Sequence, residues 1–200
     1  YYFSKSNIGL PRATNYLISK VKTKYFLFTQ ADIFIDEKSI TYLRKAFSYQ
    51  NNLIFTGPSF GKKRKKGFQI KNKLNAACML CNTKRTKKIG FFDEDFFLYW
   101  EDVFLMRKIN LSKFKMLQSN KAIARHPSGA SSINNMKVQF IRNLNFKYGE
   151  YIFDLKVNKF RFIKLFRQFS QSLIFFIISS LLLRKNVAIK NIAIFFSLLI

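Results

Sequence analysis

The sequence predicts an α/β domain over residues 1–132, followed by a basic and apolar, all-helical region over residues 133–200. Two observations indicate the α/β domain. Short apolar runs alternate with segments whose apolar residues recur at helical spacing. Polar residues follow several of these runs, where open α/β sheets place their ligands. Beyond residue 132 the pattern is helical throughout, and this change sets the expected boundary.

The first half of the α/β domain is expected to hold two helices and three strands. In order, these are a helix from Pro11 to about residue 21, strands at 24–29 and 33–35, a helix that starts at Asp36 or Ser39, and a strand at 53–56. The run KYFLFT at 24–29 is typical of a buried strand of the parallel type. Gly57-Pro58 is expected to end the strand that begins at residue 53.

The second half is expected to contain strands at 75–81, 114–117 and 122–124, a basic helical turn at 83–89 and a helix from about 101 to 109. The loop GKKRKKG at 61–67 is either a solvated charge run or a lid that contacts phosphate. Cys78 and Cys81 lie in an apolar run without a second cysteine pair. We therefore expect core thiols rather than a zinc or redox site, in a protein of a reducing compartment.

The C-terminal region combines basic and aromatic residues at 156–167 with two apolar runs that Arg184 and Lys185 separate. Each run has about 15 residues, whereas a transmembrane helix needs roughly 20. We expect peripheral or monotopic attachment to an anionic membrane surface. A buried helical hairpin and part of a spanning segment are the alternatives.

Acidic residues gather in one stretch of a strongly basic chain. The net charge is +26, yet five of the 10 acids lie between residues 90 and 108: Asp93, Glu94, Asp95, Glu101 and Asp102. Aromatic residues surround them. One interpretation is a loop and a helix N-terminus, which favours negative charge. The other is a catalytic site, in which Asp102 is the general base for an acceptor hydroxyl and Glu101 its neighbour.

Two further polar residues stand at the ends of expected strands. Asp32 follows the strand at 24–29, and His126 follows the strand at 122–124. With water and phosphate oxygens, an Asp and a His can hold Mg²⁺ or Mn²⁺, which would neutralise a leaving diphosphate. The sequence contains no Walker motif, G-x-G-x-x-G or G-x-S-x-G. The motifs that characterise P-loop NTPases, Rossmann dehydrogenases and α/β-hydrolases are therefore absent from it.

The order of these pieces resembles the family 2 glycosyltransferases, in particular the rhamnosyltransferase-like branch that builds bacterial surface polysaccharides. The N-x-G-x-x-x-A-x-N segment stands here as Asn7, Gly9, Ala13 and Asn15, and the strand-ending triplet as Gln30-Ala31-Asp32. The G-x-F-D-E-x-F-F-x-Y-x-E-D block is matched over residues 90–102. The H-x-x-G-x-S segment is matched by His126, Gly129 and Ser131.

The resemblance implies a glycosyltransferase fold of the A type with a nucleotide-sugar donor and a glycan or lipid-linked acceptor. It implies an inverting reaction with Asp102 as the base, and a divalent metal, Mg²⁺ or Mn²⁺, on Asp32 and His126. It assigns substrate binding to Asn7, Gly9, Asn15, Asp93, Glu94 and Trp100. The family's first, base-binding strands would precede Tyr1, so we expect the chain to be a fragment. The expected place is the cytoplasmic face of the plasma (inner) membrane.

Two other classes compete with a glycosyltransferase. A nucleic-acid-binding module would account for the charge of +26 and for aromatics among Lys and Arg. It is disfavoured because clustered acids repel phosphate. A catalytically inactive, membrane-bound module would account for Gln30, which stands where the family has an acidic residue or Asn.

Overall fold

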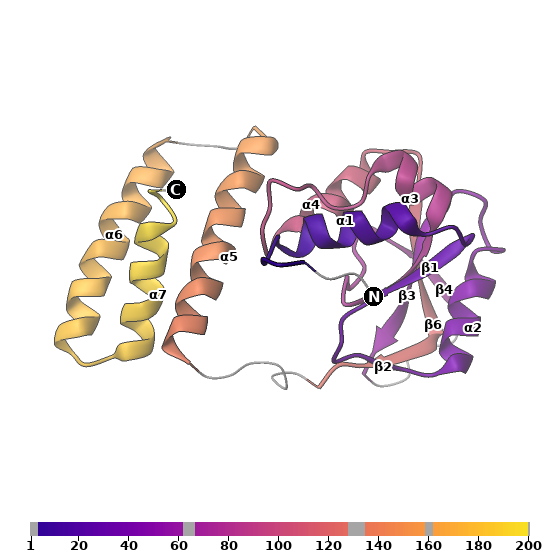
Figure 1. The fold of residues 1–200 in the computed structure, drawn as a ribbon, viewed down its shortest axis with the longest axis horizontal. Coiled ribbons are helices and arrows are strands. Elements are labelled where there is room, and N and C mark those ends of the chain that lie inside the picture. The colour runs from indigo at the N-terminus through magenta and orange to yellow at the C-terminus, as the bar shows by residue number, and fades with distance from the viewer. Residues whose placement is uncertain (1–3, 62–66, 128–134, 159–161, 200) are drawn as a thin grey trace. The chain divides into compact units, whose positions relative to one another are not determined.

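The computed structural model describes residues 4–61, 67–127, 135–158 and 162–199, and the chain forms two units (Figure 1). The first unit consists of residues 1–5, 12–93 and 102–131, and the second of residues 6–11, 94–101 and 132–200. Two short segments from the earlier half of the chain therefore belong to the second unit, which the sequence did not indicate. The basic run at 62–66, Gly129 and Ser131 lie outside the described residues.

The first unit is a mixed α/β fold. Its elements are α1 (Leu10–Lys20), β1 (Tyr25–Thr29), β2 (Phe34–Ile35), α2 (Glu37–Ala46), β3 (Leu53–Phe60), β4 (Phe68–Lys71), β5 (Cys78–Asn82), α3 (Thr83–Ile89), α4 (Glu101–Asn110) and β6 (Lys115–Arg125). The strand order is β1-β5-β3-β6-β2, and β4 also pairs with β6. β3 and β6 are parallel, and the other described pairs are antiparallel.

Helices cover both faces of this sheet because successive strand side chains point to opposite faces. On β5, Met79 and Cys81 join a cluster with Ile18 of α1 and Leu105 of α4, whereas Leu80 packs with Leu43 of α2. Figure 1 shows α1 and α4 together on one side of the sheet and α2 apart from them. Cys78 and Cys81 are free and buried, which confirms the prediction of core thiols.

Local chemistry explains where the predicted helices begin. Asp36 is the N-cap of α2 and accepts a hydrogen bond from the Ser39 amide at 2.6 Å. Asn82 caps α3 in the same way, accepting from the Arg85 amide at 3.0 Å, and Gly90 with φ +72° follows the helix. The predicted starts of these helices and of α4 are confirmed.

The prediction of a buried, parallel-type strand at 24–29 is wrong. β1 pairs antiparallel with β5 and stands at the end of the described strand order, so its side chains are only half-buried. Its residues are apolar on both sides because Phe26 and Phe28 meet one core cluster and Tyr25 and Leu27 the other. A strand between two helical layers therefore has the same apolar pattern as a parallel strand.

Three other strand predictions need correction. β3 continues through Gly57-Pro58 to Phe60, because β5 pairs with it only at Phe55 and Thr56, and the pairing with β6 shifts register after Pro58. The expected strands at 114–117 and 122–124 are parts of the single strand β6. β5 begins only at Cys78, and β4 was not predicted.

Among the described residues, the regular elements of the second unit are helices. Its helices are α5 (Met136–Lys156), α6 (Phe162–Leu181) and α7 (Lys185–Phe196), and α7 packs against both of the others. The Phe195 ring of α7 is tilted against the Phe169 ring of α6, and their centroids are 4.6 Å apart. The centroids of Phe196 of α7 and Phe140 of α5 are 6.1 Å apart. The prediction that the second part is all helix holds for the residues described.

Candidate functional site

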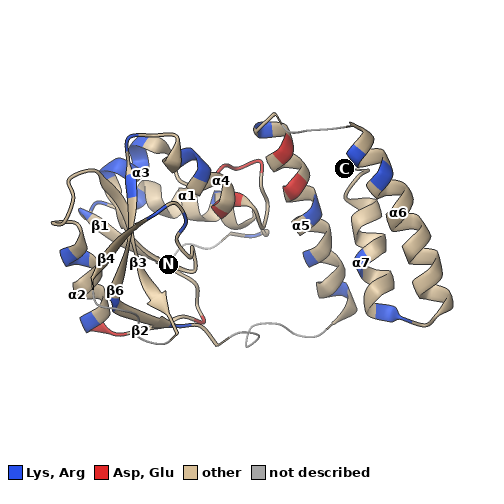
Figure 2. Cartoon of the chain, turned by 180° about the vertical axis from the view of Figure 1, so that it is seen from behind, with Lys and Arg blue, Asp and Glu red and all other residues tan. Residues whose placement is uncertain are grey.

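The acidic stretch is a loop between α3 and α4, built on buried aromatic rings. Figure 2 shows acids concentrated here in a mostly basic chain. Phe91, Phe92 and Phe96 are between 1% and 4% exposed. The Phe91 ring lies 5.3 Å from that of Phe28 and 5.6 Å from that of Phe55, edge to face. These rings anchor the loop to the core, so that the acids between them are held at the surface.

The segment Asn7–Asn15 is joined to this loop by hydrogen bonds. The Asn15 side chain donates to the Phe92 carbonyl at 2.8 Å and accepts from the Phe92 amide at 3.1 Å. The Leu10 amide donates to the Phe97 carbonyl at 3.0 Å. Gly9 has φ +81°, and a Cβ there would lie 2.8 Å from the Phe97 ring. Two stretches predicted to serve one site are therefore in contact.

These contacts also give the predicted substrate ligands a structural task. The Asn7 side chain accepts from the Gly9 amide at 3.0 Å and so fixes the turn that precedes α1. The Asn15 amide is engaged with the backbone of Phe92. Asn7 thus shapes the turn before α1, and Asn15 holds the start of the acidic loop.

The backbone just before α4 is strained. Tyr99 and Trp100 have φ of +70° and +68°, a region that costs an L-residue about 1–3 kcal/mol. The Trp100 ring lies 5.2 Å from Phe153 and 5.7 Å from Phe146, both on α5. Its buried indole N–H has no hydrogen-bond acceptor among the described residues. Trp100, predicted to bind substrate, thus packs on α5 through its ring.

Glu101 and Asp102 are the first two residues of α4. Glu101 is buried, at 7% exposure, whereas Asp102 is half-buried. The Asp102 carboxylate accepts from the Val103 amide at 2.8 Å. This placement agrees with a helix N-terminus, which favours negative charge. Of the two carboxylates, Asp102 is the more accessible to a substrate.

Of the other acids of the loop, Glu94 and Asp95 are exposed and Asp93 is half-buried like Asp102. Asp95 forms an ion pair with Lys156 of α5 at 2.6 Å, and its side chain is 67% exposed. The exposed ion pair of Asp95 contributes little to stability. Asp93 and Glu94, which are predicted to contact an acceptor, are accessible to solvent.

Asp32 and His126, 94 residues apart, lie side by side. The His126 Nε2 atom is 3.2 Å from the Asp32 Oδ2 atom. The sheet register explains the pairing, because Phe34 of β2 stands opposite Arg125 of β6 and so brings the flanking residues together. Their side chains are 20% and 35% exposed, so a ligand can reach them.

The pair fits two ligands of one divalent cation. Two adjacent ligands about 2.1 Å from Mg²⁺ lie roughly 3 Å from each other in an octahedron. Within the described parts of the chain, no group of three His, Cys, Asp or Glu residues could hold a metal. An ion here would take its remaining ligands from water and from substrate oxygens, as Mg²⁺ commonly does. Asp102, the predicted general base, lies on α4, whereas Asp32 and His126 flank β2 and β6.

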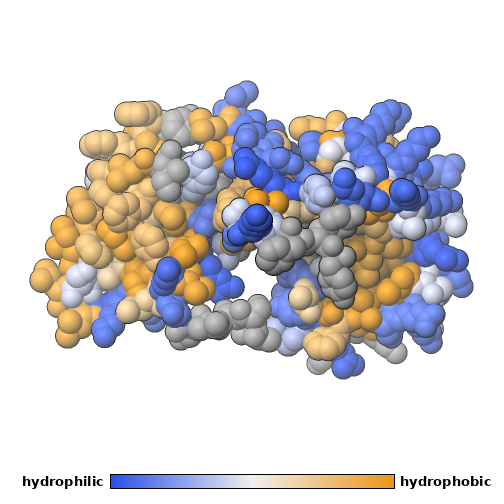
Figure 3. Space-filling view, viewed as in Figure 1, coloured by the Kyte–Doolittle hydropathy of each residue, from blue (hydrophilic) through white to orange (hydrophobic). Residues whose placement is uncertain are grey.

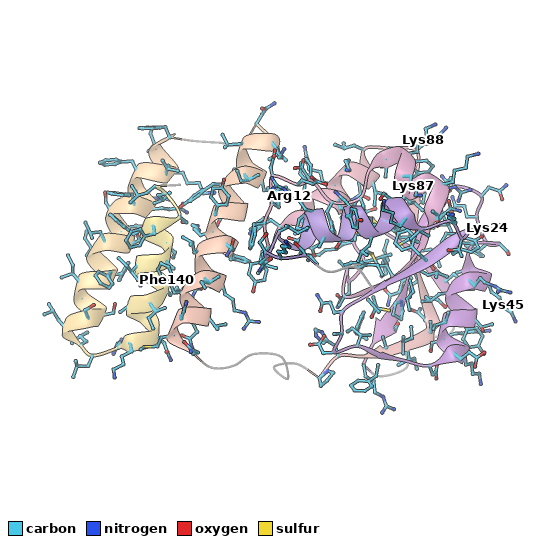
Figure 4. The ribbon with its side chains drawn as sticks, viewed as in Figure 1. Arg12, Lys24, Lys45, Lys87, Lys88 and Phe140 are labelled. Carbon is cyan, nitrogen blue, oxygen red and sulfur yellow. The ribbon has the colours of Figure 1, made fainter. Side chains whose placement is uncertain are left out.

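An open pocket of about 340 Å³ lies between α1, α3 and the start of the acidic loop. It is lined by Asn15, Ile18, Ser19, Thr86, Lys87, Gly90, Phe91 and Phe92. Figure 4 labels Lys87 at this end of α1, where its ammonium donates to the carbonyls of Ser19 and Val21 at 3.1 and 2.8 Å. The pocket contains none of the predicted catalytic or metal residues.

The chain matches no model of a known protein family, and no curated protein matches it. The site is therefore described by its own geometry. Sequence reasoning missed the strained Tyr99–Trp100 backbone, since neither residue type favours positive φ. It also missed Gly149 of α5. A Cβ there would lie 3.0 Å from the Trp100 ring and from the Tyr99 carbonyl oxygen, and a glycine inside a helix is the only signal that could have indicated this contact.

Proposed function

We propose that the chain acts as an inverting glycosyltransferase, which moves a sugar from a nucleotide-sugar to a hydroxyl of a glycan or lipid-linked acceptor in cell-surface glycan synthesis. The observation that carries the proposal is the contact between Asp32 and His126, which pairs the two residues chosen from sequence as metal ligands. The mixed sheet is compatible with the A-type glycosyltransferase fold. Rhamnose as the sugar rests on the resemblance alone.

The proposed mechanism is a direct displacement. Asp102 takes the proton from the acceptor hydroxyl, and the oxygen attacks the anomeric carbon from the face opposite the nucleotide. The C–O bond to the nucleotide breaks, and the configuration of the sugar inverts. A divalent cation held by Asp32 and His126 would supply charge neutralisation to the departing diphosphate. Asn15, through Phe92, holds the loop that carries the acids.

The test combines a panel of nucleotide sugars with Mn²⁺ and a lipid-linked or glycan acceptor. Asp102→Asn should abolish transfer and leave donor binding intact, because it removes the base and keeps the shape of the side chain. Asp95→Asn is the matched control: it changes an acid of the same loop that is paired with Lys156, and it should leave transfer unchanged. Retained turnover in Asp102→Asn would contradict the assignment.

The competing classes give different results in the same experiment. Salt-sensitive binding of arbitrary oligonucleotides without any binding of sugar nucleotides would support a nucleic-acid-binding module. Binding of neither sugar nucleotides nor nucleic acid would support a catalytically inactive, membrane-bound module. The concentration of acids at residues 93–102 favours the glycosyltransferase over the nucleic-acid module.

A further inference from the structure

The helices of the second unit pack with small residues inside and large apolar residues outside. The most buried side chains of α6 and α7 include Ser172, Ser179, Ala188 and Ala193, each at most 8% exposed. On α6, Ile163, Phe166 and Leu181 are 84%, 66% and 78% exposed. A helix in water buries its large apolar residues and exposes small or polar ones. Small residues at the contact and large apolar residues outside are typical of helices in lipid.

Exposed apolar residues gather on one side of α6, which also carries Arg167 and Ser170. At 3.6 residues per turn, Ile163, Ile174, Ile178 and Leu181 fall on the side opposite Ser172 and Ser179, which are buried in the unit. Figure 3 shows apolar surface gathered over α6. α6 is the one helix, within the described residues, that is long and apolar enough to cross a membrane. Exposed apolar surface of this extent marks an interaction site.

We propose that α6 is a monotopic membrane anchor, which lies lengthwise at the boundary between the headgroups and acyl chains of an anionic bilayer. The anchor is independent of the proposed glycosyl transfer, since it depends only on helices of the second unit. The anchor face of α6 consists of Ile163, Phe166, Ile174, Ile178 and Leu181.

Charge selects the bilayer over a second copy of the chain as the occupant of this face. Arg167 lies within the first three turns of α6, and Arg184, Lys185 and Lys190 follow its C-terminal end; all four are exposed. Figure 2 shows basic residues near the start of α6 and along α7, whereas the rest of α6 is uncharged. A second copy would bring like charges together, whereas anionic headgroups attract each of them.

The packing of α5 selects a helix that lies in the membrane plane over one that crosses it. α5 packs along α7 and carries charged residues over its whole length: Lys137, Arg142, Lys147, Glu150, Asp154 and Lys156. Lys164 near the start of α6 pairs with Glu150 and Asp154 at 3.3 and 2.7 Å. If α6 crossed the hydrocarbon, these helices would carry buried charges with it. With α6 in the plane, α5 stays in water.

The first experiment measures co-flotation of the full chain with vesicles of phosphatidylcholine, with and without 30% phosphatidylglycerol. The double variant Ile163→Ser/Leu181→Ser should lower the partition coefficient by about tenfold or more, since each change removes apolar area from the anchor face. The control Ile70→Ser/Leu111→Ser changes the same residue types at exposed positions of the first unit, 44% and 76% exposed. It should bind like the parent chain. Equal loss in both variants, no binding by the parent, or a stable dimer that hides the face would overturn the proposal.

The second experiment measures depth. Both native cysteines are buried, so a nitroxide on a cysteine introduced at Ile163, Ile174 or Leu181 reports one site. The accessibility of each nitroxide to oxygen and to a water-soluble nickel complex gives its depth in the bilayer. If α6 lies in the plane, the three positions should have similar depths, about 5–10 Å below the headgroup boundary. A helix that crosses would be deepest at Ile174 and shallow at the other two, and this profile would overturn the proposal. Ser172→Cys, on the buried side, is the control and should show little contact with lipid.

Discussion

The Asn15 side chain holds the main chain of Phe92 through two hydrogen bonds, one in each direction, at 2.8 and 3.1 Å. An amide side chain that pairs with one peptide unit imitates a strand partner. Here it fixes the start of the acidic loop against α1, in the first unit. The segment predicted to bind substrate and the predicted catalytic loop are therefore joined by a side chain that the resemblance predicts to be a substrate ligand.

Asn15→Ala should lower the free energy of unfolding by about 1–3 kcal/mol, because it leaves a partly buried peptide group without its partners. Urea unfolding followed by circular dichroism measures the change. Asn110→Ala removes a single exposed hydrogen bond to the Asn72 carbonyl and should cost about 1 kcal/mol or less. Equal losses in the two variants would contradict the role given to Asn15.

Gly149→Ala should destabilise the chain, although alanine is normally the better helix former by about 1 kcal/mol. The added Cβ would lie 3.0 Å from the Trp100 ring and from the Tyr99 carbonyl oxygen, and overpacking of this kind costs about 1–3 kcal/mol. Asn145→Ala on the same helix gives the baseline and should be neutral or stabilising. A rise in the thermal midpoint of Gly149→Ala would show that the contact is loose.

Alkaline pH should lower stability from about pH 9 upward. Burial raises the pKa of Cys78 above its ordinary value of 9.0 and that of Cys81 well above it. The unfolded chain loses these protons first, so above that pH it binds fewer protons than the folded chain, and the free energy of unfolding falls as the pH rises. Urea titrations at about pH 8 and pH 10.5 under reducing conditions measure the decline.

The matched variant for this effect is Cys78→Ala/Cys81→Ala. Its unfolding free energy is expected to be lower at all pH values because of the cavities. Its decline between the two pH values should be shallower than that of the parent chain. An unchanged slope would mean that the thiols do not govern the alkaline loss.

His126→Ala should weaken the binding of Mn²⁺ in the presence of a nucleoside diphosphate by about tenfold or more, a loss of roughly 1.4 kcal/mol or more. It removes one of the two neighbouring side chains that we propose as metal ligands. Electron paramagnetic resonance of free Mn²⁺ gives the affinity directly. Glu37→Gln removes an exposed carboxylate at the start of α2. It controls for non-specific binding of Mn²⁺ to surface acids and should bind Mn²⁺ like the parent chain.

Helices with a polar cap could be predicted from the sequence, whereas several strand boundaries could not. Asp36 before α2 and the run Thr83–Ile89 carry local signals for where a helix begins. β3 passes through Gly57-Pro58 because the pairing on that side has already stopped, and this depends on partners far along the chain. Local composition holds no information on such partners.

The same division applies to the site. Asp32 and His126 could be selected as polar residues after strands, and their contact follows only from the register of Phe34 against Arg125. Asp102 could be placed at the start of α4 from its neighbours alone. Tyr99 and Trp100 have positive φ, and the Trp100 ring packs on Phe146 and Phe153 of α5, more than 30 residues later. No local pattern indicates contacts at that separation.

β6 has consequences for the order in which the first unit can fold. Along one edge it pairs with β3, and along the other with β4 at Met116–Ser119 and then with β2 at Ala124–Arg125. β2 and β4 thus obtain their partner, and β3 its second partner, only after the ribosome has released residue 125. Until then their edges stay open to pairing with other chains, and such unpaired edges favour aggregation. The sheet closes late and over long sequence separations, which makes its folding slow.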